Sequence, residues 1–307
     1  MTAKLKIAYQ GEPGANSHIA CVQAAPDHDP MPCPTFEDAF QAVESGKAAL
    51  AMIAIENTTA GRVADVHHLL PGSHLSIVGE HFLRIEFHLM AVPGVKLETI
   101  KEVHSHVHAL GQCRKFIREH KLKPVVAADT AGAARELSES RIPTQAAIAT
   151  KLAAETYGLK ILARNIEDEE HNTTRFVILS KKPKPLVSGK QKMITSFVFR
   201  VRNVPAALYK AMGGFATNGV NMTKLESYQL EGQFSATQFY ADIEGHPDDA
   251  NVKLALEELG FFTSYVRVLG AYPASGYRAE IAKRRGALSA ALPGAFRASP
   301  PASGRGE

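Results

Sequence analysis

The stretch from Ala48 to Asn57, written AALAMIAIEN, constrains the fold more than any other, because its first eight residues are all apolar. An uninterrupted apolar run of this length is typical of a strand buried on both faces, as in a parallel sheet covered by helices. The run stops abruptly at Glu56-Asn57. Since parallel strands are usually connected by helices, we expect the rest of the chain to alternate strands with helices, as in an α/β protein.

The segments before this run follow that alternation. Leu5, Ile7 and Tyr9 recur with a period of two and meet a loop rich in Gly and Pro, which predicts a strand, a tight turn and then a helix. Thr35 and Asp38 have the spacing of a capping box, and they predict the start of a second helix.

Strand and helix patterns recur further along the chain. Alternating apolar residues at 83–91 predict a strand, and residues 146–157 predict a helix. Shorter strands are expected at 125–127, 159–162 and 176–179. Ligands of α/β sheets bind beyond the carboxyl ends of strands, and three polar residues lie at or just past such ends: Asn57, Ser105 and Thr130.

The pattern changes after a charged, proline-bearing linker at 183–192. Residues 193–272 read as strand, helix, strand, strand, helix, strand, which is the ferredoxin-like α+β motif. Residues 273–307 are dominated by Ala, Pro, Gly, Ser and Arg near their end, and we expect this tail to be disordered.

Composition excludes several classes of protein. The net charge is +4 over 307 residues, without the dense basic stripe and interleaved aromatic residues of a nucleic-acid-binding protein. The three unpaired cysteines indicate reduced thiols. Because the chain has neither a membrane-spanning run nor a signal peptide, we expect a cytoplasmic protein without a membrane partner.

A polar run leads directly into an apolar strand at EHNTTRFVIL, residues 170–179. A threonine hydroxyl can donate a hydrogen bond, and a guanidinium can bind a carboxylate through two parallel hydrogen bonds. Taken alone, however, Thr174-Arg175 is more often the start of a strand with an exposed ion pair. The three histidines at 104, 106 and 108, with Cys113, do not have a zinc-site spacing, so no metal is expected.

Seven segments, in this order and spacing, resemble prephenate dehydratases that carry a C-terminal ACT regulatory domain: YQGEPGANS, IAIENTTAGRV, IVGEHFLRIEFHL, VHSHVHALGQC, AAIATKLAAETYGLKILARNIED, NTTRFVIL and PAALYKAMGGFATNGVNMTKLES. The resemblance implies a two-lobed catalytic unit, residues 1–182, with the fold of a type II periplasmic binding protein. It places lobe one at about 1–80 and 166–182, lobe two at about 81–165, and the ACT domain at 193–272.

The same resemblance implies an activity, namely the decarboxylating dehydration of prephenate to phenylpyruvate without a cofactor. Thr174 and Arg175 would be catalytic and face the interlobe cleft. The residues expected to contact the substrate are Asn57, Thr58, Ser105, His106, Thr130 and Phe176. A close alternative is arogenate dehydratase, and another is a non-catalytic small-molecule sensor on the same fold.

Regulation by L-phenylalanine and assembly into a homodimer or homotetramer are further implications of the resemblance. The segments Ala206-Ala207-Leu208 and Glu226-Ser227-Tyr228-Gln229 depart from the Gly-Ala-Leu and Glu-Ser-Arg-Pro patterns usual in the family's regulatory domain. The positions expected to bind the effector are Asn203, Ala206, Ala207, Leu208, Asn221, Leu225, Glu226 and Ser227.

Overall fold

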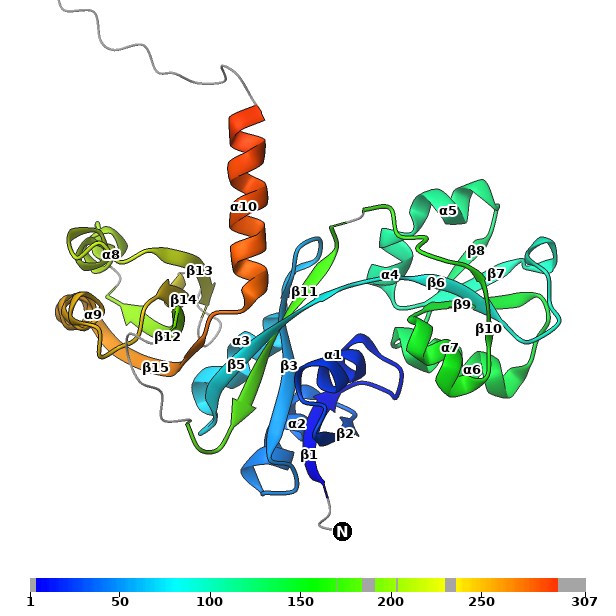
Figure 1. Ribbon diagram of the computed structural model, residues 1–307, viewed down its shortest axis with the longest axis horizontal. Helices are drawn as coiled ribbons and strands as arrows, with labels where there is room; N and C mark the ends of the chain where they lie inside the picture. Colours follow the sequence, from blue (N-terminus) through cyan, green and yellow to red (C-terminus); the bar gives the residue numbers. More distant parts are fainter. Residues whose placement is uncertain (1–3, 170, 184–190, 203, 230–235, 292–307) are drawn as a thin grey trace, which may run out of the picture. The chain divides into compact units, whose positions relative to one another are not determined.

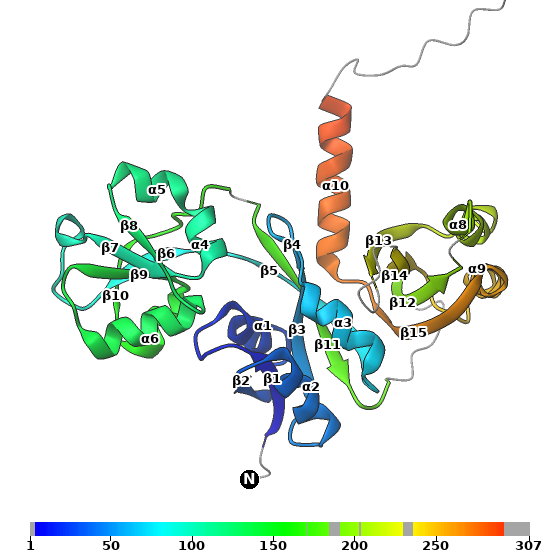
Figure 2. The same ribbon diagram turned by 180° about the vertical axis from the view of Figure 1, so that it is seen from behind.

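The computed structural model describes residues 4–169, 171–183, 191–202, 204–229 and 236–291. The chain divides into two compact units between Ala274 and Ser275. The first unit contains three sheets, which are shown from opposite sides in Figures 1 and 2. Among the helices described, none combines the length and apolarity needed to cross a membrane.

The first sheet carries the expected buried run at its centre, with strand order β2-β1-β3-β11-β5 and a short β4 paired to β3. Helix α1 packs on one face, and α2 and α3 pack on the other. The capping box of Thr35 and Asp38 is present at the start of α2, as predicted. The bounds are β1 Leu5–Gln10, α1 Asn16–Ala24, β2 His28–Cys33, α2 Phe36–Glu44, β3 Leu50–Asn57, β4 Gly61–Arg62, α3 Ala64–Gly72, β5 Ser76–Arg84 and β11 Thr173–Ser180.

The second sheet has the order β10-β6-β9-β7-β8 and belongs to the other lobe. Its buried apolar residues pack against the surrounding helices, α6 and α7 among them. The bounds are β6 His88–Ala91, the 3₁₀ helix η1 Leu97–Thr99, β7 Glu102–Ser105, α4 Val107–Gln112, α5 Arg114–Glu119, β8 Lys123–Val126, α6 Thr130–Ser140, β9 Gln145–Ala149, α7 Lys151–Tyr157 and β10 Lys160–Ala163.

Two predictions within these lobes are wrong in detail. The single strand expected at 83–91 is two strands, because the chain leaves the first sheet after Arg84 and enters the second at His88. Apolar residues still alternate in the segment that connects the two strands, because Ile85 and Phe87 are buried in the core as well. The first lobe's sheet therefore extends beyond the boundary expected at residue 80.

The helix expected at 146–157 begins only at Lys151, because Gln145–Ala149 is strand β9. This strand lies between β6 and β7, and residues 146–149 are completely buried. Its small apolar residues have helical propensity, but pairing on both edges overrides that weak local preference.

The third sheet has the order β13-β14-β12-β15 and the predicted βαββαβ connectivity. Helices α8 and α9 lie side by side on one face, where both contact a core containing Phe197 and Phe199 (Figure 1). On the opposite face, Val198 and Tyr240 share a core with residues of the first lobe. The bounds are β12 Met193–Val201, α8 Ala207–Thr217, β13 Met222–Gln229, β14 Ala236–Glu244, α9 Ala250–Phe262 and β15 Thr263–Pro273.

Strand β15 approaches β5 of the first lobe very closely at Gly270. A Cβ atom at Gly270 would overlap the carbonyl oxygen of Ile77. Glycine is therefore required for this backbone-to-backbone contact between the C-terminal domain and the first lobe.

The second unit contains helix α10, Gly276–Ala291. The expectation of disorder from 273 onward is therefore wrong as far as residue 291. The helix begins after Ser275, whose hydroxyl accepts a hydrogen bond from the Tyr277 N–H at 3.3 Å. Its sequence is rich in Ala and Arg, which are strong helix formers.

Candidate functional site

Thr174 and Asn57 lie opposite each other on the antiparallel strands β11 and β3. The Asn57 Nδ2 amide donates to Thr174 Oγ1 at 3.0 Å and to Asn172 Oδ1 at 2.8 Å. Asn57 Oδ1 accepts from the Thr59 hydroxyl at 2.7 Å and from the backbone N–H of Ala60 at 2.9 Å. The amide is therefore held in one orientation, while Thr174 Oγ1 accepts one hydrogen bond and keeps its own proton for donation.

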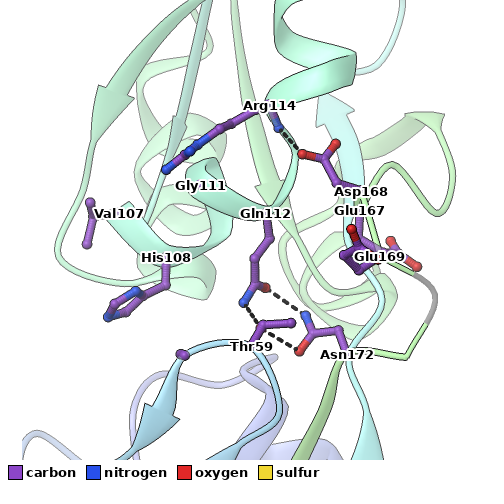
Figure 3. Close-up of a pocket in the computed structure, with 11 residues that line it drawn as sticks. Thr59, Val107, His108, Gly111, Gln112, Arg114, Glu167, Asp168, Glu169 and Asn172 are labelled. Atoms are coloured by element: carbon purple, nitrogen blue, oxygen red, sulfur yellow. Dashed lines mark hydrogen bonds between the residues drawn. The ribbon is translucent and has the colours of Figure 1, made fainter. Parts of the chain in front are cut away.

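Two further amides extend this arrangement to the second lobe, as Figure 3 shows. Asn172 Nδ2 donates to Gln112 Oε1 at 2.6 Å, and Gln112 Nε2 donates to Thr59 Oγ1 at 2.5 Å. Gln112 ends α4 in the second lobe, so this ring of hydrogen bonds joins the two lobes. The sequence analysis did not select Gln112 and Asn172, although both lie inside the quoted segments VHSHVHALGQC and NTTRFVIL.

A pocket of about 430 Å³ opens beside this ring. Two of its acidic residues already have structural partners. The Asp168 carboxylate accepts from the backbone N–H groups of Arg114 and Lys115, at the start of α5. Glu167 accepts from the Phe87 N–H at 3.0 Å. The pocket is lined by Thr59, Ala60, Val107, His108, Gly111, Gln112, Arg114, Glu167, Asp168, Glu169 and Asn172.

The Arg114 side chain extends along this pocket and over Gly111 (Figure 3). Among the residues that the structure describes, no carboxylate forms an ion pair with its guanidinium. Arg114 is therefore available to bind an anion in the pocket.

Arg175 does not share this site with Thr174, contrary to the expectation that both face one cleft. Its Nε donates to Glu80 at 2.9 Å, its Nη1 donates to Glu56 at 2.9 Å and to Asp242 at 2.5 Å, and its Nη2 donates to the Tyr272 hydroxyl at 2.8 Å. The physical reason is the geometry of a strand, in which successive side chains point to opposite faces.

The electrostatics of this cluster favour the charged forms of Arg175 and Glu56. Burial alone would lower the pKa of Arg175, but Asp242 and its other partners raise that pKa well above its ordinary value. Burial would likewise raise the pKa of Glu56, but Lys224 and Arg175 outweigh burial and lower it. Arg175 is thus a permanently charged, buried group with only 3% of its side chain exposed.

The other residues expected to contact a substrate have varied surroundings. The Thr58 hydroxyl joins two segments, since it donates to the His171 carbonyl at 3.0 Å and accepts from the Thr173 N–H at 2.9 Å. His106 Nδ1 accepts from the His108 N–H at the start of α4.

Three more of these residues lie away from the pocket just described. Ser105 is fully buried and donates to the Ile148 carbonyl at 2.6 Å. Phe176 is 1% exposed and packs in the core, because it lies on the face of β11 that contacts α1. Thr130 is the first residue of α6, and the neighbouring Asp129 is the N-cap residue.

The residues expected to bind an effector lie at the start of α8 and along the edge strand β13, except that Asn203 is outside the described residues. Ala206 has a φ of 62°, in the left-handed region that favours glycine. Ala207 and Leu208 follow it as the first two residues of α8. Asn221 donates to Glu244 at 3.0 Å. Of the remaining three, Leu225 is partly exposed, Glu226 accepts from Lys224, and the Ser227 carbonyl accepts from Arg62.

The architecture defines a class, the two-lobed α/β proteins, here with a pocket lined by residues of both lobes and joined to a ferredoxin-like domain. A family model described as prephenate dehydratase matches residues 7–184. The chain belongs to the prephenate dehydratase family.

Relatives agree with this assignment. A bifunctional N-acyl-homoserine lactone acylase/prephenate dehydratase of Komagataeibacter europaeus is 51% identical over 278 residues, covering 91% of this chain and 99% of the relative. Arogenate dehydratase 2 of Petunia hybrida is 37% identical and covers 88% of this chain and 72% of its own length.

A solved structure supports the fold over nearly the whole chain. The prephenate dehydratase of Arthrobacter aurescens in complex with L-Phe superposes with a TM-score of 0.80 at 31% identity. The match covers 94% of this chain and 100% of that one.

Proposed function

We propose that this chain is a prephenate dehydratase, which converts prephenate into phenylpyruvate, carbon dioxide and water. The observation that carries the proposal is the Asn57–Thr174 hydrogen bond, because it leaves the Thr174 hydroxyl proton for donation and is connected through Asn57 to Asn172, which lines the pocket. In the reaction, the electrons of the ring–carboxylate bond enter the ring as carbon dioxide leaves. The hydroxyl on the opposite ring carbon departs and takes up one proton from the solvent, so that it leaves as water.

The roles of the side chains follow from this chemistry. Thr174 donates to the departing oxygen, where negative charge develops in the transition state, and Asn57 fixes the direction of that hydroxyl. Arg114 binds a carboxylate of the dianion, since its guanidinium has no acidic partner among the described residues. The amides of Gln112 and Asn172, which line the pocket, supply further polar contacts.

The C-terminal domain is an ACT regulatory domain in this proposal, and L-phenylalanine is its effector. The L-Phe complex of the Arthrobacter relative supports this assignment. The residues of β13 and of the start of α8 would bind the effector. A cytoplasmic location and a homodimeric or homotetrameric state stay predictions.

The name of the Komagataeibacter relative includes a second activity, acylase, which needs a nucleophile or an activated water. Burial raises the pKa of Cys113 and Cys21, so these thiols are poor nucleophiles. Ser105 is buried and donates its proton to a backbone carbonyl. These observations favour dehydration over acyl transfer at the described site.

The deciding experiment incubates the purified full chain with prephenate and records the absorbance of phenylpyruvate. Arogenate is tested in parallel, with phenylalanine as the measured product. We expect turnover of prephenate. Faster turnover of arogenate would identify arogenate as the preferred substrate. The absence of turnover of both compounds would favour a non-catalytic sensor.

A further inference from the structure

Thr174 is the proposed hydrogen-bond donor to the departing oxygen, and Asn57 orients it. Each of these two residues has a charged neighbour in its strand whose side chain lies on the other face of the sheet. Asn57 follows Glu56 in β3, and Thr174 precedes Arg175 in β11. The strands pair in register, with Thr174 opposite Asn57 and Arg175 opposite Glu56. The ion pair between Arg175 and Glu56, at 2.9 Å, is therefore next to the Thr174–Asn57 hydrogen bond along the two strands and on the opposite face of the sheet.

The C-terminal domain supplies two further partners of the Arg175 guanidinium, in addition to Glu80 of β5. Asp242 of β14 and Tyr272 of β15 accept from its two terminal nitrogens. Ser196 of β12 donates to Asp242 at 2.5 Å and lies 2.6 Å from the Tyr272 hydroxyl. Asp242, Tyr272 and Ser196 are completely buried, so three strands of the third sheet enclose one guanidinium.

A second connection reaches the other strand of the pair. Lys224 of β13 forms an ion pair with Glu56 and lies 3.2 Å from Glu226. The segment after Asn57 continues into β4, where Arg62 donates to the Ser227 carbonyl at 2.5 Å. Both strands that carry the candidate catalytic residues are thus bonded to the C-terminal domain.

We propose that Asp242 and Tyr272 are positioning residues for the dehydration, acting through Arg175 on the geometry of Thr174 and Asn57. This inference rests on the proposed function. A buried guanidinium needs all its partners, because an unpaired buried charge or donor is costly. When one partner is lost, the Arg175 guanidinium turns or strand β11 shifts. Either change displaces the Thr174 hydroxyl. A displacement of about 1 Å can cost roughly 100-fold in rate.

The test compares Tyr272→Phe with Tyr228→Phe. Both variants remove one buried hydroxyl from the third sheet, but the Tyr228 hydroxyl accepts from Gln238 at 2.7 Å and does not contact Arg175. We expect Tyr272→Phe to lower kcat at least tenfold, with KM changed less than about twofold. Tyr228→Phe should lower Tm about as much as Tyr272→Phe does, but it should leave kcat within about twofold of the wild-type value. Asp242→Asn, which keeps the shape but removes the charge, should reproduce the loss in kcat.

A double-variant cycle separates positioning from general destabilisation. The fold-change in kcat caused by Tyr272→Phe is measured in two backgrounds, the wild type and Thr174→Ser. If Tyr272 acts through the Thr174 hydroxyl, these two fold-changes should differ by at least threefold. Equal kcat values for Tyr272→Phe and Tyr228→Phe, or independent effects in the cycle, would overturn the inference while leaving the dehydratase proposal intact. A wild-type protein inactive on both substrates would remove the proposed function and this inference with it.

Discussion

Thr174 and Arg175 are adjacent in sequence, yet their side chains have separate partners on opposite sides of β11. Thr174 Oγ1 accepts from Asn57 at 3.0 Å, whereas Arg175 binds Asp242 and Tyr272 of the C-terminal domain. The two residues therefore have different connections: Thr174 is bonded to Asn57, whose amide also holds Asn172 of the pocket lining, and Arg175 anchors the same strand to another domain.

Thr174→Ala should reduce kcat by about 100-fold or more, because the donor to the departing oxygen is lost. The Tm should change little, since the hydroxyl and the γ-methyl group that are lost belong to a side chain that is only partly buried. Thr174→Ser retains the hydroxyl and should stay within about tenfold of wild-type kcat. Steady-state kinetics with prephenate compare the three proteins. Wild-type kcat in Thr174→Ala would remove this residue from the mechanism.

Arg114→Gln should raise KM for prephenate by about tenfold or more, with a smaller change in kcat, because a charge-assisted hydrogen bond to a carboxylate is lost. Arg118→Gln is the matched control, since Arg118 lies one turn further along α5 and does not line the pocket that contains Gln112. Identical KM values for the two variants would show that the substrate carboxylates bind elsewhere.

His67 should make the protein less stable in mild acid. Burial, followed by Lys224, lowers the pKa of His67 from 6.5 to about 4; Arg62 also lowers it, whereas Glu226 and Glu56 raise it. The ring packs edge-on against Tyr240 at 5.1 Å, and neither ring nitrogen has a hydrogen-bond partner among the described residues.

The direction of this effect follows from the two protonation states. Between pH 6.5 and about 4 the unfolded chain binds a proton at His67, but the folded protein does not. Stability from this group is therefore lost as pH falls through that range, by up to roughly 3 kcal/mol.

The measurement is the Tm of the full chain from pH 7 to pH 4.5. The loss of Tm should be smaller in His67→Leu, whereas His68→Gln, at an exposed neighbouring histidine, should keep the wild-type slope. Parallel Tm curves for the wild type and His67→Leu would contradict this assignment.

The sequence predicts most of the fold because local patterns and packing agree over most elements. The apolar run of β3 and the capping box of α2 are confirmed. The alternation over the third sheet also gives the correct order of strands and helices. Predictions fail where partners distant in sequence decide, as at β9, whose alanines become a strand by pairing with β6 and β7.

The candidate site is less predictable for the same reason. Asn57 is singled out as a polar residue at the end of an apolar run, whereas Thr174 is selected only through the family resemblance, since Thr174-Arg175 taken alone favours a strand start with an exposed ion pair. Two partners of Arg175, Asp242 and Tyr272, lie 67 and 97 residues away in another domain, and no local pattern connects them. Gln112 likewise becomes part of the site only when α4 meets Thr59 and Asn172.

Gly270→Ala should separate β15 from β5, because the new methyl group would overlap the Ile77 carbonyl oxygen. Backbone on both sides leaves no flexible side chain to move aside, so we expect a loss of about 1–3 kcal/mol, measured as a lower Tm. The same shift displaces Tyr272, which follows in the same strand, and kcat should fall with Tm. Gly260→Ala is the matched control, because nothing lies within 4 Å of its added Cβ and alanine favours helix α9. If Gly270→Ala and Gly260→Ala show the same Tm and kcat, the close contact between β15 and β5 is not required in solution.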